Sequence, residues 1–196
     1  MNMIDDYLRV KFNDKPILGI DPASRRMGWA ITTATGIIDA GVIVSNNQSL
    51  DHRFLDMHTT ITPIFDTFKS MGGVAICVEQ YVSRSMSGTD AVKGIIGILR
   101  LEAIRRDLEV VEIYPATVKK LLVGHGNASK EEVCEKVIEK LGIVPQYYLK
   151  DDNITDALAI SIAERMRQEE KKQDLLKIMK LIEDAGGICD VTTIYK

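Results

Sequence analysis

Apolar residues in this chain fall into short runs bounded by turns and into longer stretches with a helical period. Short apolar runs flanked by glycine, proline or polar residues are typical of buried strands. Five such runs predict strands at residues 16–22, 29–33, 37–44, 74–78 and 110–114. The first run carries Asp21 near its end, so one carboxylate is expected at the mouth of a core strand.

The spacing of these runs indicates how the strands pair. Only short turns separate the first three runs, which predicts an antiparallel meander. Residues 51–70 place apolar side chains near a 3.6-residue period and predict an amphipathic helix crossed by Pro63. This helix supplies the crossover that lays the fourth strand parallel to the first. The sequence therefore predicts an α/β fold with a five-stranded mixed sheet flanked by helices.

The second half of the chain is mainly helical. Helices are predicted at 89–106, 118–123, 130–141, 154–167 and 169–185, followed by a short strand at 189–194. The third of these opens with the capping-box spacing of Ser129 and Glu132 and stops at Gly142. We divide the chain into an N-terminal arm (1–15), one α/β domain (16–168) and a C-terminal helical extension (169–196).

Composition places the protein among ordinary soluble globular chains. Apolar residues make up 45% and charged residues 27% of the 196 positions. No apolar run is long enough to span a bilayer and the N-terminus lacks a signal-peptide pattern, so we expect no membrane association and a cytoplasmic location. Cys77, Cys134 and Cys189 are widely spaced, as expected of reduced structural thiols.

The charge distribution is compatible with a nucleic-acid partner in one part of the chain. The formal net charge is −3, but residues 80–130 carry a net +3. Phosphate contacts are therefore expected in that middle third.

Three carboxylates sit on apolar elements. Asp21 and Glu79 end apolar strands, and Asp156 opens an apolar helix. A charged group in such a place is costly to bury without a partner, and a cation is one such partner. Taken singly, each acid is better explained without a metal: Asp21 as a turn cap, Glu79 as a surface charge at a strand end and Asp156 as an acid favoured by the helix dipole. Together they predict a metal site.

The residues around these acids resemble the RuvC family of Holliday junction resolvases, within the ribonuclease H-like nuclease fold. The matching stretches are Leu-Gly-Ile-Asp-Pro-Ala-Ser-Arg at 18–25 with Gly28 and Trp29, Val-Glu-Gln at 78–80, Val-Lys-Lys at 118–120, Val-Gly-His-Gly-Asn-Ala-Ser-Lys at 123–130, and Asp-Ala-Leu-Ala-Ile at 156–160. The resemblance runs from about residue 17 to residue 163, in family order.

The resemblance implies a homodimeric endonuclease that resolves four-way DNA junctions by paired nicks, using Mg²⁺, for which Mn²⁺ is expected to substitute. Carboxylates suit this hard cation, and two-metal cleavage needs acids around ions about 4 Å apart. Asp21 is then the bridging ligand, with Glu79 and Asp156 flanking it. Two rival functions stay open: a looser nuclease for forks and flaps, and an inactive nucleic-acid-binding module.

One position departs from the family pattern. The family usually carries Asp or His three residues before the last acid, where this chain has Asn153. Asp152 lies four residues before Asp156, and both spacings share a helix face. Asp152 is therefore a candidate fourth carboxylate for catalysis and metal binding, directly or through water. The alternative is that Asp152 caps the following helix.

The resemblance also implies residues that contact DNA. Lys119 and Lys130 match family lysines that face the scissile phosphate. Arg25 and Arg84 are candidate backbone contacts, and Tyr81 is the aromatic nearest to the place where the family stacks on junction bases, which Val82 occupies here.

Two further expectations complete the site. The glycine-rich stretch around His125 lacks the Gly-Lys-Ser/Thr ending of a nucleotide-binding loop, so no nucleotide cofactor is expected and His125 is predicted to be an ordinary loop residue. The helix at 89–106 is expected to form much of the dimer contact. Its apolar residues and two glycines are Gly94, Ile95, Gly97, Ile98 and Leu99.

Overall fold

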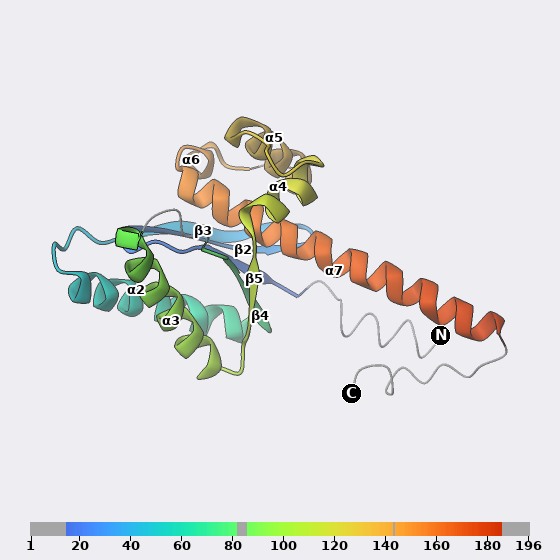
Figure 1. Cartoon of the computed structure of the whole chain (residues 1–196), viewed down its shortest axis with the longest axis horizontal. Coiled ribbons are helices and arrows are strands. Elements are labelled where there is room, and N and C mark those ends of the chain that lie inside the picture. Colours follow the sequence, from blue (N-terminus) through green and yellow to red (C-terminus); the bar gives the residue numbers. More distant parts are fainter. Residues whose placement is uncertain (1–14, 82–85, 143, 186–196) are drawn as a thin grey trace. The chain divides into compact units, whose positions relative to one another are not determined.

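The computed structural model describes residues 15–81, 86–142 and 144–185 (Figure 1). Its contacts define one compact unit, Lys15–Arg165, and a second unit to which the described residues 166–185 belong. The strand predicted at 189–194, nearly all of the N-terminal arm and the predicted DNA contact Arg84 lie outside the described residues. No helix in the described part of the chain is long and apolar enough to cross a membrane.

The predicted five-stranded mixed sheet is confirmed. Its strands are β1 (Ile17–Asp21), β2 (Arg26–Thr33), β3 (Gly36–Val44), β4 (Ala75–Glu79) and β5 (Glu109–Ile113). They lie in the order β3-β2-β1-β4-β5. The first three strands pair antiparallel, while β1 with β4 and β4 with β5 pair parallel. The short turns and the helical crossover therefore fixed the topology as expected.

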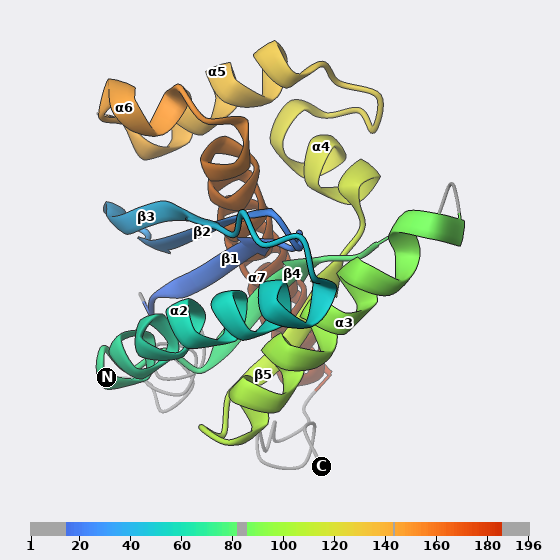
Figure 2. The ribbon, with the colours of Figure 1, turned by 90° about the vertical axis from the view of Figure 1, so that its left-hand side faces the viewer.

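Two helices cover one face of this sheet, α2 (Leu50–Ser70) and α3 (Met86–Ile104) (Figure 2). Alternate strand residues point into this layer and meet the apolar face of α2. The side chains at its centre are fully buried: Leu18, Ile20, Ile76, Val78, Ile61, Phe65 and Phe68. This is the main hydrophobic core.

Ion pairs around one buried carboxylate also join α2 to α3. The Glu102 side chain is 1% exposed and accepts hydrogen bonds from Arg106 at 2.6 Å and from His58 at 3.1 Å. Burial alone would raise the pKa of Glu102, but hydrogen bonds from Arg106 and His58 outweigh it and lower that pKa. These ion pairs let a carboxylate remain charged inside an apolar layer.

Most of the α3 residues predicted to form the dimer contact pack into this core instead. Ile95 and Leu99 are buried, and Ile98 packs against them. A side chain at Gly94 would come within 2.3 Å of the Phe54 ring, so that glycine serves the contact with α2. The helical period was right, but the apolar positions face inward because α2 occupies that side.

The opposite face of the sheet carries α4 (Pro115–Val123), α5 (Lys130–Leu141), the unpredicted α6 (Gln146–Leu149) and the first part of α7 (Asp152–Asp184). The capping box at Ser129 and Glu132 is present, with Gly142 after the last turn of α5. Helix α4 begins three residues earlier than predicted, with Pro115 at its first position, where its missing N–H costs nothing.

Helix α7 replaces the two helices predicted at 154–167 and 169–185. The charged stretch between them contains neither glycine nor proline. Instead it supplies helix-compatible pairs, such as Gln173 with Glu169 and Lys177 with Asp174. Charge at this point therefore marks an exposed helical surface and not a break.

Candidate metal centre

Strand register brings the first two predicted acids together. In the parallel pair β1–β4, Ile20 lies beside Val78, so the next residues, Asp21 and Glu79, end neighbouring strands. Adjacent strands are about 4.8 Å apart. Because side chains alternate, Asp21 points to the same face as Gly19, which is the face that contacts α7. The adjacency follows from the crossover connection alone.

The third acid arrives on α7, which approaches the sheet closely because two glycines provide room. A Cβ at Gly19 would lie 2.3 Å from the carbonyl oxygen of Ala157. A Cβ at Gly28, the cross-strand partner of Asp21, would lie 1.9 Å from the carbonyl oxygen of Asn153. The first turns of α7 therefore rest directly on the backbone beside Asp21.

The three acids are close enough to perturb one another. Burial and the nearby Asp156 raise the pKa of Asp21 to about 6. Burial, then Asp21 and Asp156, raise the pKa of Glu79 to about 7. Burial also raises the pKa of Asp156. These are hard oxygen donors whose negative charges are incompletely balanced, which fits a divalent cation such as Mg²⁺.

The acids repel one another in the absence of a cation. Within the described residues, no three acidic, histidine or cysteine side chains already enclose a point where an ion would fit. Ionised carboxylates in such a group repel one another. The donor set fits the chemistry of a divalent cation.

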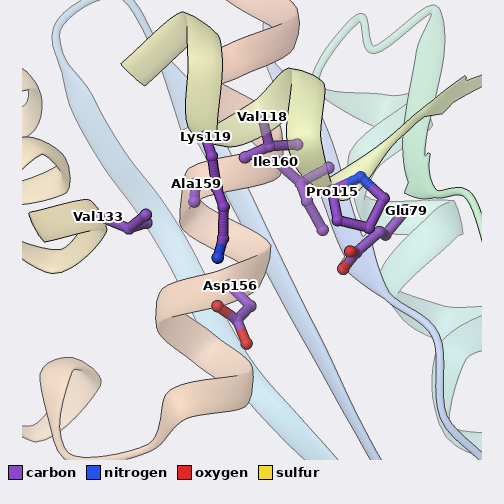
Figure 3. A pocket seen from close by; sticks show the side chains of 8 residues that line it. All are labelled: Glu79, Pro115, Val118, Lys119, Val133, Asp156, Ala159 and Ile160. Carbon is purple, nitrogen blue, oxygen red and sulfur yellow. The ribbon is translucent and has the colours of Figure 1, made fainter. Parts of the chain in front are cut away.

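A small pocket lies between α4, α5, α7 and the end of β4 (Figure 3). Its polar lining residues are Glu79, Asp156 and Lys119, and Lys119 extends from α4 towards Asp156. The Lys119 ammonium donates a hydrogen bond to the carbonyl of Ala128 at 2.6 Å. Its charge opposes the rise in pKa of both Glu79 and Asp156. Lys119 therefore ties the α4–α5 loop to the acidic centre.

The second predicted lysine lies on the open side of the centre. Lys130, the first residue of α5, donates to Asp152 at 2.8 Å and lies 3.9 Å from Asp156. The hydrogen bond that Lys130 donates to Asp152 and the charge of Asp156 raise the pKa of the Lys130 ammonium. Lys130 is 63% exposed, so its charge is available to an approaching phosphate.

The family model for the crossover junction endodeoxyribonuclease RuvC matches residues 17–164. The chain belongs to the RuvC family. It is 31% identical over 150 residues to the RuvC of Cereibacter sphaeroides strain ATCC 17023, covering 74% of this chain and 86% of that protein. It is 32% identical over 154 residues to the RuvC of Chlamydia muridarum, covering 74% and 88%.

Solved structures of RuvC proteins and a related resolvase share the fold. Thermus thermophilus RuvC in complex with a Holliday junction substrate matches with a TM-score of 0.72 at 24% identity, over 81% of this chain and 97% of that one. The yeast mitochondrial Holliday junction resolvase Ydc2 matches with a TM-score of 0.60 at 16% identity, over 93% and 92%. The ribonuclease H-like fold is thereby confirmed, and dependence on a divalent metal accompanies membership of the RuvC family.

The structure corrects one alternative for the departure of this chain from the RuvC pattern. Asp152 does not cap α7, because the cap is Asp151, whose carboxylate accepts from the backbone N–H of Asn153 at 3.0 Å. The carboxylate of Asp152 instead pairs with Lys130 and is 72% exposed. The side-chain amide of Asn153 donates to Asp151 at 2.7 Å.

Two of the predicted DNA contacts follow the acid-bearing strands β1 and β4 and differ in exposure. Arg25 is exposed in the turn between β1 and β2, and Tyr81 is half-buried just after β4. His125 contacts Asn127 at 2.9 Å and lies 3.7 Å from Glu132 in an exposed loop, which supports its interpretation as a loop residue.

Sequence reasoning missed Arg26 and Asp151, which contact each other across 125 positions. Three consecutive residues that favour helix caps, Asp151, Asp152 and Asn153, precede the apolar run, so the sequence signalled a cap there but not which residue forms it. No local signal identified Arg26.

Proposed function

We propose that this protein is a metal-dependent, structure-selective endodeoxyribonuclease that resolves four-way DNA junctions by paired nicks, with Mg²⁺ as its cofactor and Mn²⁺ as a substitute. The observation that carries the proposal is the convergence of Asp21, Glu79 and Asp156 on one face of a RuvC-family fold. We propose the domain limits 16–168 for this activity, with 1–15 as an arm and 169–196 as a helical extension.

We assign the metal ligands from their positions. Asp21 lies next to Glu79 in the sheet and interacts with Asp156, so it is the ligand best placed to be shared. The bound ions would supply activated water and stabilise the departing 3′ oxygen. The three carboxylates would hold the ions at the ends of β1 and β4 and the start of α7.

The lysines have a separate role in this proposal. Lys119 approaches the acids from α4 through the pocket, and Lys130 approaches from α5 on the side open to solvent. There they would stabilise the extra negative charge that develops on the scissile phosphate during cleavage. Lys130 must leave the partial pairing with Asp156, and its bond to Asp152 keeps it nearby.

For the fourth acid we propose Asp152, at the edge of the centre. Its carboxylate is exposed and bonded to Lys130, which supports an action through water or through Lys130 and not as an inner ligand. DNA outside the centre would be held by Arg25, by Tyr81 through stacking, and by Arg84 through the phosphate backbone.

We further propose a homodimer in which α3 contributes the contact. On the outer side of α3, Leu101 is 55% and Ile104 is 70% exposed. Gly97 lies on the same helix with open space around it. Exposed apolar side chains beside a glycine suit close packing against a second copy, and two such copies would place two metal centres on one junction, as paired nicks require.

The decisive test compares cleavage of a labelled four-way junction with that of a linear duplex, a fork and a flap of the same sequence, each with Mg²⁺ and with chelator. We expect paired, symmetrically placed nicks in the junction only. Asp21→Asn is the matched control for contaminating nucleases. Equal cutting of forks and flaps would support the looser nuclease, and junction binding without any cleavage would support the inactive module.

A further inference from the structure

We propose that Arg26, Asp151 and Asn153 form a clamp that positions the first turn of α7, and that Asn153 acts in this clamp and not as a ligand of the metal. The inference rests on the proposed function, because the residue being positioned is Asp156. It gives the position at which this chain departs from the RuvC pattern a role of its own.

The clamp joins the start of β2 to the start of α7. The guanidinium of Arg26 contacts one carboxylate oxygen of Asp151. The other oxygen accepts two hydrogen bonds from Asn153, from its backbone N–H at 3.0 Å and from its side-chain amide at 2.7 Å. The carbonyl of Asp151 accepts from the N–H groups of Ile154 and Thr155, both at 3.1 Å. Asp151 thus satisfies the free donors of the first helical turn and anchors them to the sheet.

An amide at position 153 suits this arrangement and a carboxylate does not. The amide of Asn153 donates to Asp151, whereas an ionised carboxylate has no proton to donate. Asp at this place would also set two negative charges side by side. The side-chain amide of Asn153 therefore complements the carboxylate of Asp151 within the cap.

The backbone of Asn153 is held as tightly as its side chain. Its carbonyl oxygen occupies the space where any side chain at Gly28 would lie. Gly28 in turn is the cross-strand partner of Asp21. The turn that carries Asn153 is thus seated on the residue opposite the central acid of the site.

Asp156 lies three residues after Asn153, within about one turn of the helix. Its carboxylate must stay near Asp21, whose cross-strand partner Gly28 supports the same helical turn, although two ionised carboxylates repel each other. A helix end tied to β2 resists this repulsion. Without the tie, α7 is expected to tilt away from the sheet at its first turn and to carry Asp156 with it.

The test uses Asn153→Asp in the full chain, because the two roles predict opposite results. If the clamp is correct, the variant binds Mn²⁺ about tenfold more weakly, because it loses the side-chain hydrogen bond to Asp151 and gains repulsion between two carboxylates. Binding is measured from the electron paramagnetic resonance signal of free Mn²⁺. If Asn153 is a ligand, the added carboxylate strengthens Mn²⁺ binding and lowers the metal needed for half-maximal cleavage. Stronger or unchanged Mn²⁺ binding overturns the proposal.

A second variant guards against misfolding and against failure of the proposed function. Arg26→Ala is expected to weaken Mn²⁺ binding roughly threefold, as loss of a partly exposed ion pair allows, and Arg26→Lys to restore most of it. Lys150→Ala removes a neighbouring exposed charge outside the clamp and is the matched control. Unchanged Mn²⁺ binding in Arg26→Ala contradicts the clamp. The Mn²⁺ readout holds even if the wild-type protein does not cut junctions.

Discussion

The two faces of the sheet are built on different principles. On the α2–α3 face, large side chains such as Ile61 and Phe65 fill the space between helix and strand. On the α7 face near the acids, the absence of side chains at Gly19 and Gly28 lets backbone meet backbone. The first face derives its stability from buried apolar area, which tolerates small volume changes. On the second face, direct backbone contacts set the position of α7. These contacts leave no room for an added side chain at Gly19 or Gly28.

The proposed chemistry lies on the glycine-lined face, the one with Gly19 and Gly28. Replacing an acid on this face is expected to have the largest effect on cleavage. We expect Asp21→Asn, Glu79→Gln or Asp156→Asn to reduce cleavage by roughly 10³-fold or more, because a proposed metal ligand is lost. Junction binding should be unchanged or stronger, since repulsion of phosphate falls. Rates and affinities measured on the same junction check this. A parallel loss of binding and cleavage would contradict the metal assignment.

Substitutions of the two lysines test whether the same face stabilises the transition state of cleavage. Lys119→Ala and Lys130→Ala are expected to lower the cleavage rate about 10²-fold, more than they lower affinity, because their charge acts on the transition state. Lys120→Ala, on the exposed side of α4, is the control. If a salt titration shows that only affinity suffers and that low salt restores it, the two lysines are ordinary phosphate contacts.

A matched pair of substitutions separates the two faces directly. Gly28→Ala is expected to cost roughly 2–3 kcal/mol of stability and most of the activity, because its methyl group would overlap the carbonyl of Asn153. Ile61→Val, in the core of the other face, should cost about 1 kcal/mol and leave the cleavage rate unchanged. Thermal melting and single-turnover cleavage of both variants test the contrast. An equal loss of activity in the two variants would contradict the proposed difference between the two faces.

The acidic centre should also be visible in the stability of the metal-free protein. The folded-state pKa values of Asp21, about 6, and Glu79, about 7, lie above the ordinary values of 3.8 and 4.5. The folded state therefore binds more protons than the unfolded state, and stability falls as the pH rises from about 4 through 7.

Asp21→Asn removes part of this penalty. With chelator present it should melt about 5 °C above the wild type at pH 8, corresponding to roughly 2 kcal/mol, and the difference should shrink towards pH 4. Saturating Mg²⁺ should reverse the order at pH 8. A melting difference that does not vary with pH would contradict the proposed repulsion.

The smallest expected effect concerns the edge of the glycine-lined face. Asp152→Asn should raise the Mg²⁺ needed for half-maximal cleavage several-fold, because it releases Lys130 and removes a nearby carboxylate. Its melting temperature should stay within about 1 °C of the wild type, since Asp151 provides the helix cap. A magnesium titration beside a melting curve measures both. An unchanged magnesium requirement would exclude Asp152 from the catalytic centre.

The sequence predicted the first face and the pairing of Asp21 with Glu79, because these follow from local periodicity and from the rule for crossover connections. It did not predict the close contacts of Gly19 and Gly28, which depend on the path of a helix more than 120 positions away along the chain.

The wrong predictions for α3 and for the cap of α7 also arise from long-range contacts that the local pattern does not contain. On α3 the helical period identified one apolar face but not the element that covers it, so buried Leu99 was assigned to the dimer contact, whereas Ile104 is exposed. Asp151 and Asp152 are chemically identical, and only the start of α7 distinguishes the cap from its neighbour. Long-range position therefore decided what local pattern left open.

The wide separation of the clamp residues along the chain has a consequence for the order of folding. Arg26 meets Asp151 across 125 positions, whereas β1, β2 and β3 pair through short turns. Contacts that close long loops pay a larger entropic cost and form late. During synthesis, the meander is therefore expected to fold long before α7 leaves the ribosome. The proposed metal centre is completed only when α7 is added, so an unfinished chain carries Asp21 and Glu79 but not Asp156.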